Sequence, residues 1–201
     1  AYLDKRTLPK NKASADSYKR RINTMLNWGI KNKYQCSDLV KFKLASSPPS
    51  RNRIFNDDEI EIIINKFNPR LFRQFCEFAY NTGARSGEIR QLSKDNIHNG
   101  NILVNGKTGT RTIKLNKRAK ELLGNYDYTR SYISHQFKSQ ARLYGIKNAR
   151  FHDLRRTFGY KLIKKGMSIY QVSKLLGHKS VITTENHYAP LFVNDIKDFT
   201  L

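Results

Sequence analysis

The sequence has few of the residues that build disulfides, metal centres or membrane spans. Cys36 and Cys76 are its only cysteines, and they lie far apart without CxxC spacing, so neither a disulfide framework nor a zinc site is expected. No apolar run approaches the roughly 20 residues that cross a bilayer, and the N-terminal residues show no signal-peptide core. These absences favour a protein of a reducing compartment that has no membrane partner.

Acidic residues are also scarce, and the charge balance is the dominant property of the chain. Its 201 residues include 38 Lys and Arg against 16 Asp and Glu, a formal net charge of +22. This excess is larger than solubility requires, and it is typical of proteins that bind a polyanion, of which nucleic acid is the first candidate. The alternative is a solvated basic surface, produced by an AT-rich genome that favours Lys and Asn codons.

Proline and serine divide the chain. Residues 46–53 form a basic Pro/Ser linker between a short helical region, 1–45, and a longer domain, 54–201. Apolar residues at helical spacing from Ser14 predict a helix in the first region, in which Trp28 is expected to pack. Residues 1–53 alone carry 13 basic and 3 acidic side chains, almost half of the excess charge.

The longer domain is predicted to be mainly α with a small β-hairpin or sheet. Asn56 and Glu59 form a capping box at the start of a helix, and a second helix is expected from Pro69 to Gly83. Alternating apolar residues at 102, 104, 113 and 115 flank Asn-Gly-Lys-Thr-Gly, which predicts a hairpin with Lys107 at its tip. Helices are expected again at about 116–123 and 131–144.

Chemically distinctive side chains are concentrated between 151 and 188. His152 and Arg155 are three residues apart and share one face of a helix. His178 follows Gly177, which suits a helix C-terminus, and Tyr188 closes the stretch. Two imidazoles, a guanidinium and a phenol can hold an oxyanion, move protons and attack an electrophile. Tyr170 lies at helical spacing among apolar residues and is expected in the core.

Arg85 lies outside that stretch, between two glycines at a helix junction. Its small neighbours let the backbone approach another group closely and leave the guanidinium projecting. Glu88 follows three residues later and is expected to form an ion pair there. Arg85 could instead be an ordinary surface arginine without a functional role. In the same way, Lys107 could simply be solvated on the hairpin.

Five segments, taken in order, resemble the motifs of the tyrosine recombinase (phage integrase) family: TGARSGEI at 82–89, GKTG at 106–109, HDLRRTFG at 152–159, LLGHKS at 175–180 and TTENHYAPL at 183–191. The resemblance covers about residues 54–191. More loosely, residues 1–45 are similar to part of that family's core-binding domain and are shorter than a complete one. The resemblance implies a partial DNA-clamping region that is followed in the sequence by a tyrosine recombinase-like catalytic domain.

The resemblance also implies an activity, that of a site-specific DNA recombinase (integrase) of a mobile genetic element. Such an enzyme cleaves and rejoins double-stranded DNA at an attachment or recombination site through a 3′-phosphotyrosyl intermediate. Arg85 and Arg155 would clamp the nonbridging phosphate oxygens, for which guanidinium forks are suited, and Tyr188 would attack the phosphorus.

The remaining implied roles concern protons and oxygens. Lys107 would protonate the leaving 5′-oxygen, His152 would assist proton transfer involving Tyr188, and His178 would hydrogen-bond a nonbridging oxygen. No cofactor or metal is expected, because the cations are side chains. The implied assembly is a homotetramer on DNA, in the cytoplasm and associated with the nucleoid or with viral DNA.

Two other functions are compatible with the same residues. The first is a type IB topoisomerase-like or hairpin-resolving enzyme, which cuts and reseals DNA without exchanging two sites. The second is a non-catalytic DNA-binding protein on the same fold. The presence of all six expected side chains argues against the second function.

Overall fold

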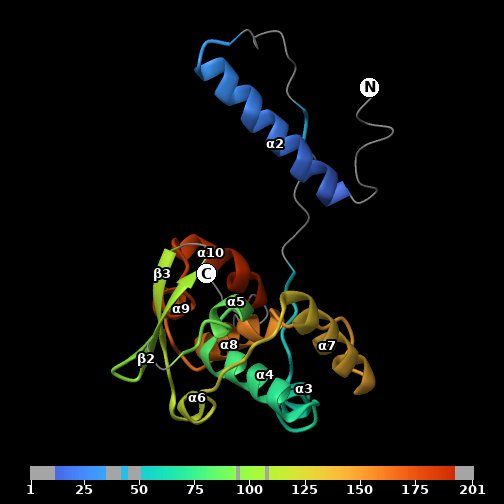
Figure 1. Cartoon of the computed structure of the whole chain (residues 1–201), viewed down its shortest axis with the longest axis vertical. Coiled ribbons are helices and arrows are strands. Elements are labelled where there is room, and N and C mark those ends of the chain that lie inside the picture. Colours follow the sequence, from blue (N-terminus) through green and yellow to red (C-terminus); the bar gives the residue numbers. More distant parts are fainter. Residues whose placement is uncertain (1–11, 35–41, 45–50, 94–95, 107–108, 193–201) are drawn as a thin grey trace, which may run out of the picture. The chain divides into compact units, whose positions relative to one another are not determined.

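The computed structural model describes residues 12–34, 42–44, 51–93, 96–106 and 109–192 (Figure 1). This part of the chain is mainly helical with one small antiparallel sheet, so the predicted fold class is confirmed. The chain divides into two compact units, Ala1–Ser50 and Arg51–Leu201. The division falls inside the predicted linker, residues 46–53. No helix among the described residues is long and apolar enough to cross a membrane.

The first unit contains the 20-residue helix α2, Lys12–Lys31. Asn23 holds a short extended piece against it, because its side-chain amide donates to the carbonyl of Phe42 and accepts from the Phe42 amide at 2.9 and 2.8 Å. Trp28 stacks on Tyr34 with ring centroids 5.7 Å apart but stays 59% exposed. The packing predicted for Trp28 is therefore made with one neighbouring ring and leaves more than half of the indole exposed.

Local capping fixes the first helices of the second unit. The Asn56 side chain accepts from the Glu59 amide at 2.8 Å and Glu59 accepts in return from the Asn56 amide at 3.1 Å, so the predicted capping box at α3, Asp57–Asn65, is confirmed. Helix α4, Arg70–Thr82, begins after Pro69 and ends at Gly83. Gly83 has a φ of +62° and lies against the Phe158 ring, where a Cβ would clash. The short helix α5, Ser86–Ile89, follows.

The sheet is antiparallel with the order β1-β2-β3, formed by Ile97–His98, Asn101–Gly106 and Gly109–Lys114. Ile102 lies opposite Ile113 in the β2–β3 register, so the predicted hairpin is confirmed. Its tip, which carries Lys107, lies outside the described residues. Strand β1 was not predicted, because two residues give no periodic signal.

The rest of the unit is helical, with α6 at Lys117–Glu121, α7 at Arg130–Leu143, α8 at Asp153–Lys164, α9 at Ile169–Leu176, α10 at Val181–Tyr188 and a 3₁₀ turn at Ala189–Leu191. Helix α4 packs on α3, α6 and α8. Phe75 lies fully buried at this contact, 5.0 Å from Phe151 and 5.5 Å from Tyr126 between ring centroids. This aromatic core holds the Gly83 end of α4 beside α8.

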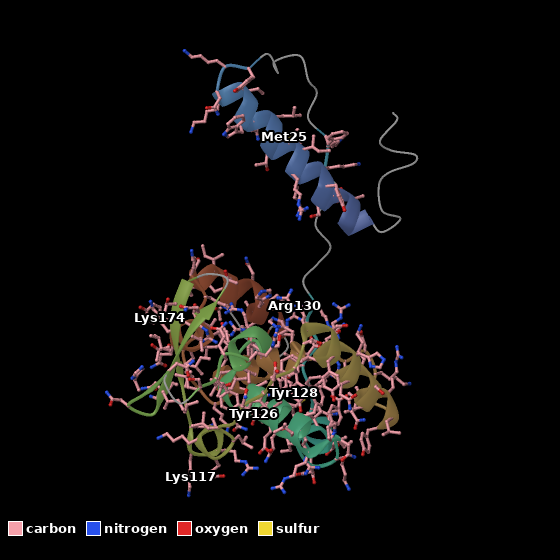
Figure 2. The ribbon with its side chains drawn as sticks, viewed as in Figure 1. Met25, Lys117, Tyr126, Tyr128, Arg130 and Lys174 are labelled. Carbon is pink, nitrogen blue, oxygen red and sulfur yellow. The ribbon has the colours of Figure 1, made fainter. Side chains whose placement is uncertain are left out.

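Tyr170 does not lie where the sequence predicted it. Its side chain is 58% exposed and lies under the ammonium group of Lys174, 5.3 Å from the ring centroid, so it is not a core residue. Val172 and Leu176 occupy the buried face of α9 and leave Tyr170 on the outer face. Of three side chains labelled in Figure 2, Lys174 and Arg130 are exposed, whereas Tyr126 is 2% exposed.

Candidate active site

The C-terminus of α9 is the point at which the site is assembled. Its last carbonyl groups have no partner within the helix and form the negative end of the helix dipole. Arg155, from α8, donates to the carbonyl of Leu176, and Arg111, from β3, donates to the carbonyl of Leu175 at 2.8 Å. Two guanidinium groups therefore meet at one helix end.

Arg155 is held on two sides. Its second donor bonds the carbonyl of Gly83 at 2.7 Å, and the residue is only 3% exposed. Burial lowers its pKa to about 9, and the positive charges of Arg85 and Arg111 act in the same direction. The guanidinium nevertheless stays protonated at neutral pH, fixed between the end of α4 and the end of α9.

Arg85 projects from the junction between α4 and α5, where it is the N-cap residue of α5. Its Nη1 donates to Glu88 Oε1 at 2.8 Å and its backbone amide donates to Glu88 Oε2 at 2.7 Å, so the predicted ion pair is confirmed. Arg85 is partly exposed, whereas Glu88 is 2% exposed. The carboxylate thus fixes the direction of a guanidinium that still reaches solvent.

Arg111 completes this ion-pair group and was missed by the sequence analysis. Its Nε and Nη2 donate to the two oxygens of Glu88 at 3.0 and 2.7 Å. Burial by itself raises the pKa of Glu88, but the hydrogen bonds and charge of Arg111, joined by those of Arg85, lower it to about 2. The available signal was alternation, which places Arg111 on the same hairpin face as buried Ile113.

The two histidines lie on turns beside the arginines. His152 immediately precedes α8 with helical backbone angles, so it shares a turn with Arg155, and its side chain is exposed on one side. Partial removal from solvent and the charges of Arg155, Arg156 and Arg85 lower its pKa. Its ring is therefore neutral at neutral pH.

His178 follows Gly177, whose φ of +64° ends α9 as expected. Its Nδ1 lies 2.8 Å from the hydroxyl of Thr184, a buried residue of α10. Burial, followed by the charges of Arg155 and Arg85, lowers the pKa of His178 to about 4. The ring is thus oriented by α10 and is neutral at neutral pH.

Tyr188 is buried at the end of α10. It is 2% exposed and packs with Val172 and Leu176 of α9. Its hydroxyl lies directly over Gly159 of α8, where any Cβ would clash with the phenol. Burial raises the pKa of Tyr188 to about 12, against the opposing charge of Arg155 and Arg156. The hydroxyl makes no hydrogen bond to a described residue.

Five of the six predicted residues are therefore brought together, and Lys107 lies outside the described residues. Arg85 is close enough to lower the pKa of both histidines and of Arg155. The charge of Arg155 in turn acts on Tyr188. The contributing segments are the α4–α5 junction, α8, the α9–α10 turn and α10, which lie far apart in sequence.

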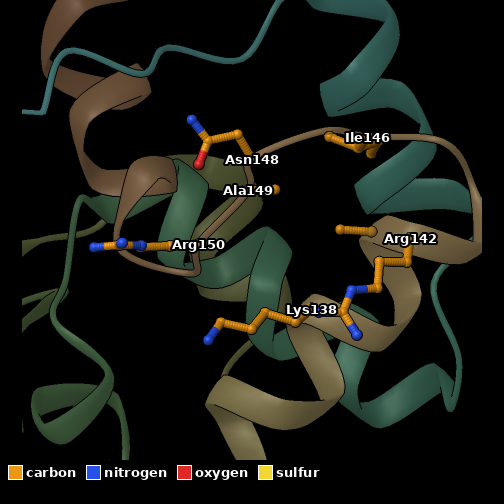
Figure 3. Close-up of a pocket in the computed structure, with 7 residues that line it drawn as sticks. Lys138, Arg142, Ile146, Asn148, Ala149 and Arg150 are labelled. Carbon is orange, nitrogen blue, oxygen red and sulfur yellow. The ribbon is translucent and has the colours of Figure 1, made fainter.

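Basic side chains surround a hollow next to this group. Lys138 and Arg142 project from α7, and Arg150 lies on the segment that leads to α8 (Figure 3). The hollow has a volume of about 240 Å³. An adjoining hollow shares Lys138 and Arg150 and reaches Ser86 and His152. A continuous basic surface thus leads from α7 to the candidate site.

Solved structures with the same fold are tyrosine recombinases. XerH bound to a palindromic difH substrate superposes with a TM-score of 0.72 at 19% identity, over 96% of this chain and 69% of XerH. The Tn1549 transposon integrase in complex with circular intermediate DNA gives a TM-score of 0.68 at 15% identity, over 93% of this chain and 78% of the integrase. The fold is that of a tyrosine recombinase catalytic domain.

Sequence comparison gives the family. Residues 53–194 match the profile of the phage integrase family, and the chain belongs to that family. A tyrosine recombinase XerD-like protein of Streptococcus thermophilus is 24% identical over 191 residues, which are 86% of this chain and 74% of the relative. Tyrosine recombinase XerA of Saccharolobus solfataricus is 30% identical over 160 residues, 70% of this chain and 54% of that protein.

Acid is expected to destabilise the second unit through His178. Because its folded pKa is about 4 and its unfolded value about 6.5, the unfolded state binds more protons between these values. The stabilising contribution is complete above pH 6.5 and is lost as the pH falls towards 4. After allowance for solvent screening we expect a loss of about 1 kcal/mol at pH 5.

Urea unfolding at pH 7 and pH 5 measures this loss. His178→Asn removes the titrating group and should show a smaller difference between the two pH values than the wild type. His135→Asn, at an exposed position of α7, is the matched control and should keep the wild-type difference. An unchanged difference in His178→Asn would assign the acid sensitivity to other groups.

Proposed function

We propose that this protein is a site-specific recombinase that cleaves and rejoins double-stranded DNA through a bond between Tyr188 and a DNA 3′-phosphate. The observation that carries the proposal is the convergence of Arg85, Arg155, His178 and Tyr188 around the end of α9. They come from four separate segments of a tyrosine recombinase fold.

The arginines act on the phosphate. Attack on a phosphodiester concentrates negative charge on the nonbridging oxygens of a pentavalent transition state. Arg155 is oriented by two backbone carbonyls and Arg85 by Glu88, so both guanidinium groups are preorganised before DNA binds. Planar forks with several donors bind two oxygens at once, which an ammonium group does less well.

The reaction exchanges one P–O bond for another. The Tyr188 oxygen bonds to phosphorus, the bond from phosphorus to the 5′-oxygen breaks, and the 5′-oxygen takes up a proton. We assign that proton to Lys107, on the hairpin tip outside the described residues. Rejoining is the reverse reaction, in which a 5′-hydroxyl attacks the phosphotyrosine. Because the bond energy is kept in the phosphotyrosine, no external energy source is required.

Proton removal from Tyr188 needs a base, because its raised pKa keeps the phenol protonated at neutral pH. His152 is assigned this role, since its lowered pKa leaves the imidazole free to accept a proton. His178, oriented by Thr184, is assigned to donate to a nonbridging oxygen. The phenol must also leave its buried position over Gly159 to reach a phosphate.

DNA binding is supported by charge. The basic surface formed by Lys138, Arg142 and Arg150 ends at His152, and none of these lining residues is acidic. We assign this surface to the DNA backbone and residues 1–45 to a partial DNA-clamping region. Strand exchange between two duplexes implies a homotetramer, acting in the cytoplasm on nucleoid or viral DNA.

A selection for covalent complexes tests the proposal. A library of end-labelled duplexes with randomised sequence around a nick is incubated with the protein, and complexes that survive SDS are isolated. When the protein cuts beside the nick, the short fragment that carries the 5′-hydroxyl dissociates. Rejoining is then impossible, so the adduct accumulates. We expect an adduct whose sequenced junctions share a common motif. Failure to recover any adduct at low salt would contradict the proposal and favour a non-catalytic DNA-binding protein.

The products formed from two copies of the selected duplex distinguish a recombinase from a topoisomerase-like enzyme. Joined strands from different duplexes are expected for a recombinase. Resealing within one duplex alone would favour the topoisomerase-like alternative.

A further inference from the structure

Arg111 lies outside the five motif segments, yet its guanidinium contacts two of them and its strand continues from a third. It bonds Glu88 of the first motif and the carbonyl of Leu175 in the fourth, and it lies two residues after the GKTG segment. We propose that Arg111 is a positioning residue that sets the direction of the Arg85 guanidinium and holds strand β3 against the end of α9. This role rests on the proposed function.

The link to Arg85 runs through one carboxylate. Each oxygen of Glu88 accepts from Arg111, at 3.0 and 2.7 Å, and from Arg85, at 2.8 and 2.7 Å. The Arg111 side chain is 9% exposed and that of Glu88 2%, so this pair is shielded from water, whereas the Arg85 side chain is 29% exposed. Arg111 therefore neutralises the buried carboxylate and leaves Arg85 available to bind a further anion.

Removal of Arg111 would change this distribution of charge. Glu88 would keep a buried negative charge with Arg85 as its remaining cation in the described contacts, and a buried charge that loses a partner is costly. The Arg85 guanidinium would then be drawn fully onto Glu88. An Arg85 guanidinium bound to Glu88 in that way has fewer N–H donors free to bind a phosphate.

The link to α9 is made by close packing. Arg111 donates to Leu175 at 2.8 Å, and its side-chain methylene group lies so close to Gly177 that a Cβ there would clash. Arg155 bonds the next carbonyl along, that of Leu176. The strand that follows the hairpin tip is thereby fixed to the turn that carries His178.

The other strand of the hairpin has its own attachment. The side-chain amide of Gln91 accepts from the Asn105 amide at 3.1 Å and donates to the Asn105 carbonyl at 2.9 Å. The hairpin therefore remains beside α5 when Arg111 is replaced. Loss of Arg111 should change the direction of Arg85 without unfolding the sheet.

The test compares Arg111→Gln and Arg111→Lys with Arg118→Gln. Arg118 makes a similar two-bond ion pair with Glu77, at 2.5 and 3.0 Å, which joins α6 to α4 and includes no residue of the candidate site. Single-turnover adduct formation is measured on the selected duplex and on the same duplex with a neutral methylphosphonate at the scissile position. We expect Arg111→Gln to slow adduct formation about 10- to 100-fold on the phosphodiester, as loss of a group that orients a ligand commonly does.

The methylphosphonate reports on the clamp, because it carries no charge for Arg85 to neutralise. If Arg111 acts through Arg85, its replacement should slow the phosphodiester reaction much more than the methylphosphonate reaction, and Arg85→Ala should show the same preference. The double variant should be little slower than Arg85→Ala alone. Arg111→Lys should recover only part of the rate, since an ammonium cannot make the fork to Glu88.

Each outcome decides a different question. Equal slowing of both substrates, or an Arg111→Gln rate equal to that of Arg118→Gln, overturns the positioning role while the proposed function stands. A wild-type protein that forms no adduct overturns the proposed function, and this role with it.

Discussion

Tyr188→Phe is expected to abolish the covalent adduct and leave the fold intact. The phenol oxygen is the only heavy atom lost, and it is the atom proposed to attack the phosphorus. Removal of a nucleophile lowers the rate by many orders of magnitude. The ring keeps its packing against Val172 and Leu176, and its hydroxyl makes no hydrogen bond to a described residue. The free energy of unfolding should therefore change by no more than about 0.5 kcal/mol.

The measurements are SDS-resistant adduct formation on the selected duplex, urea unfolding, and the affinity for the same duplex. Tyr160→Phe is the matched control, because Tyr160 packs against the same cluster but stacks on Phe192, with ring centroids 5.0 Å apart, and its hydroxyl accepts from Lys164. The control should form adduct at the wild-type rate. No other tyrosine follows residue 171, so an adduct that persists in Tyr188→Phe would place the nucleophile in another part of the chain.

Arg155→Ala is expected to impair both catalysis and stability. The guanidinium is the clamp held most firmly in the described site, and loss of one preorganised donor to an oxyanion commonly costs about 10²- to 10³-fold in rate. The same change leaves the carbonyls of Gly83 and Leu176 without their donor. Each buried polar group left unpaired costs about 1–3 kcal/mol, so the loss of two partners should lower the free energy of unfolding by about 2–6 kcal/mol.

Arg155→Lys separates the two effects. An ammonium on a shorter, unforked side chain can satisfy one carbonyl while it keeps the positive charge. Stability should therefore recover in part, whereas the rate stays well below wild type because the second carbonyl and the phosphate compete for the same group. Single-turnover rates are compared under conditions in which urea unfolding shows each variant to be folded. A rate equal to wild type in Arg155→Lys would mean that the charge alone is sufficient.

The features that could be predicted from the sequence are those that depend on interactions between residues close together in the chain. The cap formed by Asn56 and Glu59, and the left-handed helix ends at Gly83 and Gly177, depend on atoms a few residues apart. Arg85 pairs with Glu88 only three residues later in the sequence. The hairpin follows from the alternation of apolar residues and from the residues of its turn. These features, together with the order of the motif segments, identified the family and the six residues proposed for catalysis.

Tertiary structure decided what each side chain touches. Arg111 is held by Glu88, 23 residues away, and by Leu175, 64 residues away, and no local pattern measures such contacts. Tyr170 was misjudged for a similar reason, because burial depends on the elements that cover a face. The buried phenol of Tyr188 depends on Gly159 in another helix. The sequence alone determined which chemical groups are present and how the local backbone turns, while packing between distant segments decided which of those groups meet.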